Sequence, residues 1–168
     1  PSDMSWQVLW DTYLQPYEAG VKAGAATLMS SFNTLCGIPA SANHYTLTEV
    51  LKEKWNHKGF VVSDWKAVEQ LILQGVAEDR KEACEKAFNA GVEMDMFDFV
   101  YVDEMKGLVD EGKIKKRDVN DAVRRILTLK FQLGLFDNPL RPETEPGDFL
   151  KPEYISIAEE LAQESMVL

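Results

Sequence analysis

Three short apolar segments, each followed by at least one segment with helical periodicity, constrain the fold of this chain most strongly. The clearest is residues 59–63, GFVVS, which is rich in β-branched side chains and begins at a glycine. Residues 25–32 form a second candidate strand, and residues 92–96, VEMDM, form a third and more polar one. Strands that alternate with helices build a parallel sheet with helices outside it, so the expected fold class is α/β. Three such units are too few to close an eight-stranded barrel, which needs about 250 residues.

The helices are predicted from apolar spacing and from capping residues. Ser5 is placed to cap the first helix, and Pro16 to kink or divide it. Asp79 with Glu82 three residues later forms a capping-box pattern, while Asp64 and Asp118 are expected to cap two further helices. The expected helices span residues 6–23, 46–55, 65–74, 79–90, 100–110, 118–133 and 153–165, with Gly91 and Gly134 as stops and residues 34–43 as a loop.

Charge and hydropathy exclude several classes of partner. The 168 residues include 28 acidic and 18 basic side chains, for a formal net charge of −10. Nucleic acid and anionic membranes are therefore unexpected main partners, because neutralising phosphate needs a basic face. No apolar run approaches the roughly 20 residues that span a bilayer. The chain opens at Pro1 without a signal-peptide pattern, although a precursor could have lost one.

The cysteines and histidines indicate no metal site and no cofactor. Cys36 and Cys84 have neither metal nor redox spacing, and each lies among small or apolar residues typical of a buried free thiol. Only two histidines are present, which is too few for a histidine-based metal site without other ligands. The expectation is therefore no metal and no disulfide.

A change of composition near residue 137 predicts a domain boundary. Four of the seven prolines, Pro139, Pro142, Pro146 and Pro152, fall within a short stretch that reads as an interdomain linker. We expect residues 1–136 to belong to one domain and residues 137–168 to form a linker and helix leading to another. The terminal run Met166-Val167-Leu168 favours a chain that is one piece of a larger protein.

The candidate site residues lie at the ends of the predicted strands, where catalytic groups gather in parallel α/β folds. Asp64 ends the best strand and is able to serve as a nucleophile, a base or a metal ligand, or merely to cap a helix. Trp65 follows it and is able either to stack on the apolar face of a sugar or to pack on the helix layer. Met29 and Phe32 end the preceding strand and would face the same opening, unless they belong to the core.

The remaining charged residues favour structural roles. Asp95 ends the third strand, where an acid holds a loop or lines a pocket, and Glu93 alternates with it. The basic residues toward the C-terminal part are interpreted as solvated faces, namely Lys113, Lys115, Lys116, Arg117, Arg124 and Arg125.

Five blocks, in order and over nearly the whole chain, resemble glycoside hydrolase family 3. KGFVVSDW at 58–65 resembles the nucleophile signature of that family. The other blocks are ATLMSSFNTLCGIPASAN at 26–43, AGVEMDM at 90–96, AVRRILTLKFQLGLFDNP at 122–139 and AEELAQESMVL at 158–168. They resemble, in turn, the preceding strand and loop, the last barrel strand, the helix that closes the barrel, and the lead into a second domain.

The resemblance implies a retaining β-glycosidase with a TIM-type barrel followed by an α/β sandwich, and a site between the two. This chain would be the last three strands of the barrel, with Asp64 as nucleophile and with Trp65, Met29 and Phe32 lining the sugar pocket. A tyrosine is frequent in the family where Phe32 stands, so the resemblance does not carry over a side-chain hydrogen bond at that position. The acid/base and the other sugar-binding residues would belong to the rest of the same enzyme, without which the chain would be inactive.

Several alternatives stay open at this stage. The leading expectation is an exo-acting β-glucosidase, with a carbohydrate substrate and a periplasmic or secreted location implied by the resemblance, although a cytoplasmic one is possible. β-Xylosidase, α-L-arabinofuranosidase and β-N-acetylglucosaminidase are related alternatives. A fragment that binds carbohydrate without catalysis is a third possibility, of a different class.

Overall fold

The computed structural model describes residues 1–140 and 150–167. The chain divides into two compact units, residues 1–133 and 134–168. Most of the predicted proline-rich linker, with Pro142 and Pro146, lies outside the described residues.

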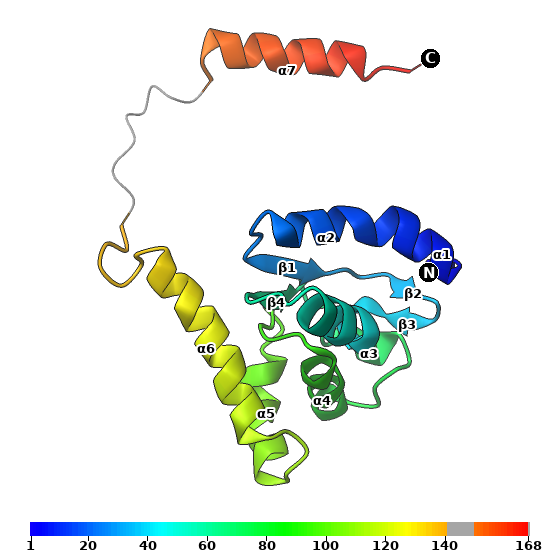
Figure 1. Ribbon diagram of the computed structural model, residues 1–168, viewed down its shortest axis with the longest axis vertical. Coiled ribbons are helices and arrows are strands. Elements are labelled where there is room, and N and C mark those ends of the chain that lie inside the picture. Colours follow the sequence, from blue (N-terminus) through cyan, green and yellow to red (C-terminus); the bar gives the residue numbers. More distant parts are fainter. Residues whose placement is uncertain (141–149, 168) are drawn as a thin grey trace. The chain divides into compact units, whose positions relative to one another are not determined.

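A short parallel sheet lies at the centre of the first unit (Figure 1). Strand β1 (Thr27–Ser30) pairs in parallel with β4 (Phe60–Ser63), so that Thr27 lies opposite Phe60 and Ser30 opposite Ser63. The predicted third strand, 92–96, is reduced to one parallel bridge between Val62 and Met94. The ladder ends there because the N–H of Met96 donates to the side-chain Oγ of Ser63, at 2.8 Å, and not to a backbone carbonyl.

Residues 34–43, predicted as a loop, contain a small antiparallel hairpin. Strands β2 (Thr34–Leu35) and β3 (Ile38–Pro39) pair across Cys36 and Gly37, whose φ angles are +49° and +81°. Two successive residues with positive φ match the twist that a two-residue hairpin turn needs. The turn exposes Cys36, so the prediction of a buried thiol is wrong for Cys36 and confirmed for Cys84.

The N-terminal helix runs as α1 (Trp6–Val8), a wide turn η1 (Leu9–Tyr13) and α2 (Leu14–Lys22). Ser5 caps it as predicted, since Ser5 Oγ accepts the N–H of Val8 at 3.2 Å. The wide turn ends three residues before Pro16, which has no N–H for the carbonyl one turn back. A second wide helix, η3 (Tyr45–Lys54), follows the short 3₁₀ turn η2 (Ala40–Ala42) and matches the predicted helix 46–55.

The helices after β4 confirm some predicted caps and correct others. Asp79 caps helix α4 (Arg80–Ala90) as predicted, because its Oδ1 accepts the N–H of Glu82 at 2.8 Å. It ends at Gly91, with φ +120°, and a Cβ there would lie 2.8 Å from Thr48 Oγ1. The predicted helix 65–74 forms only over α3 (Gln70–Leu73), so Asp64 caps no helix.

Helix α5 (Val100–Asp110) has the predicted bounds, whereas α6 (Lys116–Gln132) begins two residues before Asp118. Asp118 therefore lies in the first turn of α6 and is not its cap.

The core lies between the sheet and these helices. Its largest fully buried side chains come from β4, α3, α4, α5 and the segments next to them: Val61, Val68, Leu71, Cys84, Val92, Val100, Leu108 and Ile114. Gly59 allows β4 to begin close to the neighbouring strand, because a Cβ at that position would lie 1.7 Å from the carbonyl oxygen of Ala26. The best predicted strand is thus the central element of the core.

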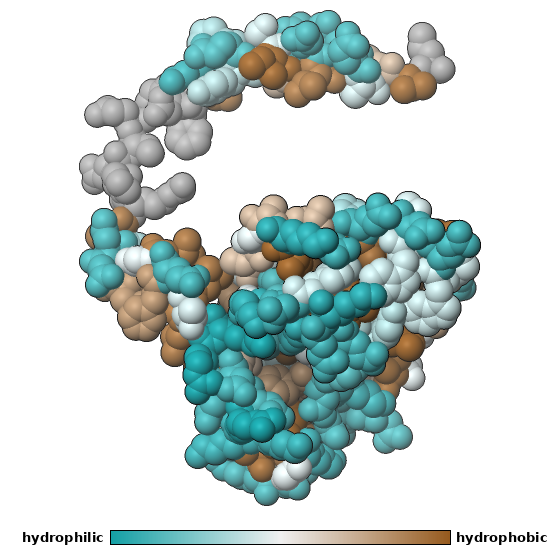
Figure 2. Space-filling view, viewed as in Figure 1, coloured by the Kyte–Doolittle hydropathy of each residue, from teal (hydrophilic) through white to brown (hydrophobic). Residues whose placement is uncertain are grey.

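The second unit contains α7 (Pro152–Glu164), which matches the predicted helix 153–165. Apolar side chains gather along one side of α7 (Figure 2), and Ile155, Ile157 and Leu161 are all exposed. No helix in the described part of the chain is long and apolar enough to span a membrane.

Candidate active site

Asp64 lies at the carboxyl end of β4 and is partly exposed. Its Oδ1 accepts the N–H of Trp65 at 2.6 Å, and its backbone carbonyl accepts the N–H of Ala67 at 3.0 Å. These contacts orient the carboxylate at the strand end and leave its other oxygen available. A carboxylate in this position is able to act as a nucleophile toward an electrophilic carbon.

The indole of Trp65 stacks on the phenyl ring of Phe97, with centroids 3.9 Å apart and planes inclined by 18°. Trp65 is 51% exposed and Phe97 is 50% exposed. Nζ of Lys66 lies 5.8 Å from the Phe97 centroid, and the Phe99 ring lies 6.0 Å from that of Phe97. The exposed Trp65 indole, with Phe97 stacked on it, is able to bind an apolar ring face.

Two acids, the buried Asp98 and the partly buried Asp95, hold the loop that carries Phe97. Asp98 Oδ2 accepts the N–H of Glu69 at 2.7 Å, and Asp95 Oδ2 accepts the N–H of Tyr101 at 3.2 Å. Burial raises the pKa of Asp95 to about 7, the neighbouring Asp98 carboxyl adds to this, and the Tyr101 N–H opposes it. Asp95 therefore holds a loop, which is one of the roles that its sequence position suggested.

Met29 lies in β1 and Phe32 just after it, and β1 neighbours the strand that ends at Asp64. Met29 pairs with Val62 in the parallel register, so the two side chains lie on the same face of the sheet. Met29 is 53% exposed. Phe32 lies beyond β1, and its carbonyl accepts the side-chain amide of Gln74 at 2.8 Å. Neither makes a ring contact or hydrogen bond with Asp64 or Trp65 in the described part of the chain.

The first unit contains a cavity of about 300 Å³, but Asp64 and Trp65 do not line it. It lies between the N-terminal helix, β1 and η3, and its walls include Leu14, Leu28 and Leu51. No group of three or more His, Cys, Asp and Glu side chains among residues 1–140 and 150–167 is arranged to hold a metal ion.

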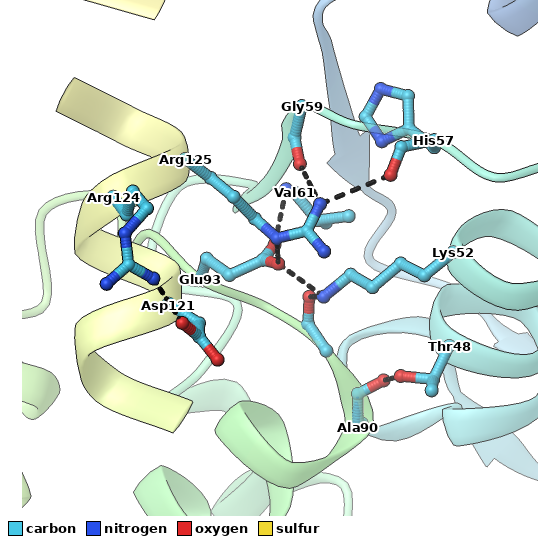
Figure 3. Close-up of polar contacts among 11 residues, drawn as sticks. Thr48, Lys52, His57, Gly59, Val61, Ala90, Glu93, Asp121, Arg124 and Arg125 are labelled. Carbon is cyan, nitrogen blue, oxygen red and sulfur yellow. Dashed lines mark hydrogen bonds and ion pairs between the residues drawn. The ribbon is translucent and has the colours of Figure 1, made fainter. Parts of the chain in front are cut away.

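An ionic network around Glu93 joins residues 92–96, the segment predicted as the third strand, to η3, β4 and α6 (Figure 3). Glu93 Oε1 lies 2.5 Å from Lys52 Nζ and 3.8 Å from Arg125 Nε, and Glu93 Oε2 accepts the N–H of Val61 at 2.7 Å. The Glu93 side chain is only 7% exposed. Burial lowers the pKa of Lys52, and Glu93 opposes that shift.

Arg125 is therefore not part of a solvated face, contrary to the sequence interpretation. Its guanidinium donates to the carbonyls of His57 and Gly59, at 3.2 and 3.0 Å, and so ties α6 to the start of β4 (Figure 3). Arg124 keeps the predicted role, because its side chain is exposed and pairs with Asp121 one turn earlier.

The sequence interpretation missed Phe97 and Ser63. Ser63 is fully buried, and its Oγ accepts the N–H of Met96, which aligns the Phe97 loop with the end of β4. The only signal for Phe97 was an aromatic residue directly after a strand candidate. That signal does not reveal that Phe97 stacks on Trp65, because Trp65 lies 32 residues earlier in the chain.

The chain is similar in sequence and fold to several known proteins. The chain is 39% identical to the periplasmic β-glucosidase of Salmonella typhimurium over 99% of its own length and 22% of that protein. It is 33% identical to a β-xylosidase of Formosa agariphila, over 99% of the chain and 24% of that protein. The crystal structure of β-glucosidase from Listeria innocua in complex with glucose matches with a TM-score of 0.89 and 38% identity, over 98% of this chain and 23% of that one.

The chain thus spans about a quarter or less of the length of these relatives. Its α/β fold, with helices around a few parallel strands, is like that of the matched β-glucosidase. The family model described as the glycosyl hydrolase family 3 N-terminal domain matches residues 1–129. The chain belongs to glycosyl hydrolase family 3.

Proposed function

We propose that this chain supplies the nucleophile of a retaining, exo-acting β-glycosidase, with a β-glucoside as the leading substrate class. The observation that carries the proposal is the position of Asp64 at the carboxyl end of β4, next to an exposed tryptophan, in a chain of this family. Relatives named β-glucosidase and β-xylosidase support a β-glycosidase, and the identity to the Salmonella typhimurium protein favours glucose over xylose.

In the proposed reaction, the Asp64 carboxylate attacks the anomeric carbon of the sugar. The bond from that carbon to the leaving oxygen breaks, and an acid from another part of the protein gives the oxygen its proton. Water then hydrolyses the ester on Asp64 and releases a sugar with the original configuration. Retention needs the second carboxyl group about 5–5.5 Å away, across the bond that breaks.

The domain assignment is part of the same proposal. Residues 1–136 are the C-terminal portion of a TIM-type barrel, and residues 137–168 lead to a second domain of the sandwich type. The parallel pairing of β1 with β4 and the parallel bridge from Val62 to Met94 support the barrel, since all strands of such a barrel run parallel. The partners are the rest of the enzyme and a carbohydrate, and the name of the Salmonella typhimurium relative favours a periplasmic or secreted location.

The function is tested by trapping the intermediate in the complete protein. Incubation with an activated 2-deoxy-2-fluoro-β-D-glucoside is expected to stop hydrolysis of an aryl β-glucoside and to add one glycosyl group to Asp64, detected by peptide mass spectrometry. The isolated 168-residue chain is expected to be inactive. Labelling of another residue, or initial release of α-glucose, would contradict the proposal.

Trp65→Ala in the complete protein is expected to lower kcat/KM for an aryl β-glucoside by roughly tenfold, which corresponds to about 1.4 kcal/mol. The reason is loss of the apolar face next to the nucleophile, and Trp65→Phe should recover part of it. Kinetics on active-site-titrated enzyme and a thermal melt of the same preparation check the prediction. A lower melting temperature with unchanged kcat/KM would instead assign Trp65 to packing.

A further inference from the structure

The indole beside Asp64 is held from one side by a ring of the same chain. Phe97 covers one face of Trp65 at a centroid distance of 3.9 Å, in near-parallel stacking. Half of the Trp65 surface is nevertheless exposed, so the opposite side of the indole stays open. This geometry leaves one aromatic face for packing within the chain and one for a ligand.

The backbone of Phe97 adopts a conformation that large side chains avoid. Its φ is +77°, and that of Phe99, two residues later, is +58°. Positive φ is unfavourable for a bulky residue, and such conformations persist only where surrounding contacts enforce them. Lys66, directly after Trp65, also has a positive φ of +56°, so the backbone turns sharply next to Trp65 as well.

Hydrogen bonds connect the two sides of the stack to the end of β4. The N–H of Lys66 donates to the carbonyl of Met96 at 3.1 Å, and the N–H of Met96 donates to Ser63 Oγ at 2.8 Å. Buried Asp98 then holds the far side of the loop through the N–H of Glu69. The Phe97 ring is therefore held relative to the backbone that carries Asp64.

An exposed position argues against a role confined to core packing. The hydrophobic core of the first unit does not include Phe97, which is 50% exposed. A side chain that leaves its ring in solvent gains little from burial. The nearest ring to Phe97 is Trp65, so the stack on Trp65 is the contact that its strained backbone chiefly maintains.

We propose that Phe97 is a positioning residue, which fixes the orientation of the Trp65 indole beside Asp64 and thereby acts on the sugar through Trp65. The catalytic consequence rests on the proposed function, in which Asp64 is the nucleophile. The support of Trp65 by Phe97 does not depend on it. The two parts are therefore measured separately.

The first measurement needs no substrate. In the complete protein, the fluorescence of Trp65 is obtained by subtracting the spectrum of the same protein with Trp65→Ala. In the Phe97→Ala variant, acrylamide is expected to quench this Trp65 fluorescence about twofold more strongly than in wild type, because one face of the indole loses its cover. Phe97→Tyr should leave it unchanged. Equal quenching in wild type and Phe97→Ala would overturn the proposal, whatever the activity.

The second measurement is a double-mutant cycle on hydrolysis of an aryl β-glucoside. Phe97→Ala is expected to lower kcat/KM about fivefold and Phe97→Tyr less than twofold. In a protein that already carries Trp65→Ala, Phe97→Ala should not lower kcat/KM any further, because a residue that acts through Trp65 has no effect once Trp65 is absent. A fivefold loss in both backgrounds, or none in either, would overturn the catalytic part.

Phe99→Ala is the matched control. Phe99 is an exposed phenylalanine with positive φ in the same loop, yet its ring meets Phe97 and not Trp65. Both the quenching signal and kcat/KM are expected to change less than twofold in this variant. If Phe99→Ala reproduced the effects of Phe97→Ala, general loosening of the loop would explain both, and the specific role of Phe97 would be refuted.

Failure of the proposed function is seen separately, as labelling of a residue other than Asp64 with the quenching result intact.

Discussion

Replacing Asp64 with alanine in the complete protein is expected to lower kcat for a β-glucoside by about 10³-fold or more. The reason is that the glycosyl ester cannot form without the carboxylate. The fold should survive, because the Asp64 side chain makes one local hydrogen bond, to the N–H of Trp65, and caps no helix. The measurement is steady-state hydrolysis of an aryl β-glucoside, with circular dichroism of the same sample.

Two controls sharpen this result. A small anion such as azide should partly restore turnover of Asp64→Ala and give a product of inverted configuration, since it attacks from the side that Asp64 occupied. Asp95→Asn, at the other acidic strand end, should keep labelling of Asp64 by the fluoro sugar, because Asp95 contacts the N–H of Tyr101 and holds a loop. Near-normal turnover in Asp64→Ala would remove Asp64 from the mechanism.

The largest effect on stability is expected from Glu93→Ala. This change leaves the ammonium group of Lys52 buried without its 2.5 Å partner and the N–H of Val61 without its acceptor. Breaking a buried ion pair from one side costs about 3–5 kcal/mol of unfolding free energy. The loss should appear as a lower urea midpoint for the complete protein.

The matched control is Asp110→Ala. Asp110 lies 2.5 Å from Lys106, the same distance as the buried pair, but these two side chains are 62% and 86% exposed. An exposed pair contributes about 0–1 kcal/mol, so this variant should unfold almost like wild type. Glu93→Ala, Lys52→Met together should recover part of the stability lost in Glu93→Ala, since no unpaired charge stays buried. Equal midpoints for Glu93→Ala and Asp110→Ala would show that burial does not strengthen the Glu93 network.

Local sequence signals predicted much of the secondary structure. The Ser5 cap, the Asp79–Glu82 cap and the stops at Gly91 and Gly134 depend on residues within one helical turn of each other, and all four are observed. The strand in GFVVS is also predicted from local sequence alone, because β-branched side chains favour the extended conformation. The glycine before it allows close approach to the neighbouring strand. The position of Asp64 at a strand end follows from the GFVVS strand alone.

The tertiary structure decided everything that depends on a distant partner. The third strand ends early because the side chain of Ser63 takes the N–H of Met96. The mixed charges of its helix suggested that Arg125 faces solvent, but its side chain contacts Glu93 and the backbone carbonyls before β4. These partners are close in space but lie 32 or more residues away in the chain, so the sequence around Arg125 does not reveal them. The same holds for Phe97 and Trp65. Helical and strand periods encode which face is apolar, but contacts between side chains on separate elements arise only when the packed core brings those elements together.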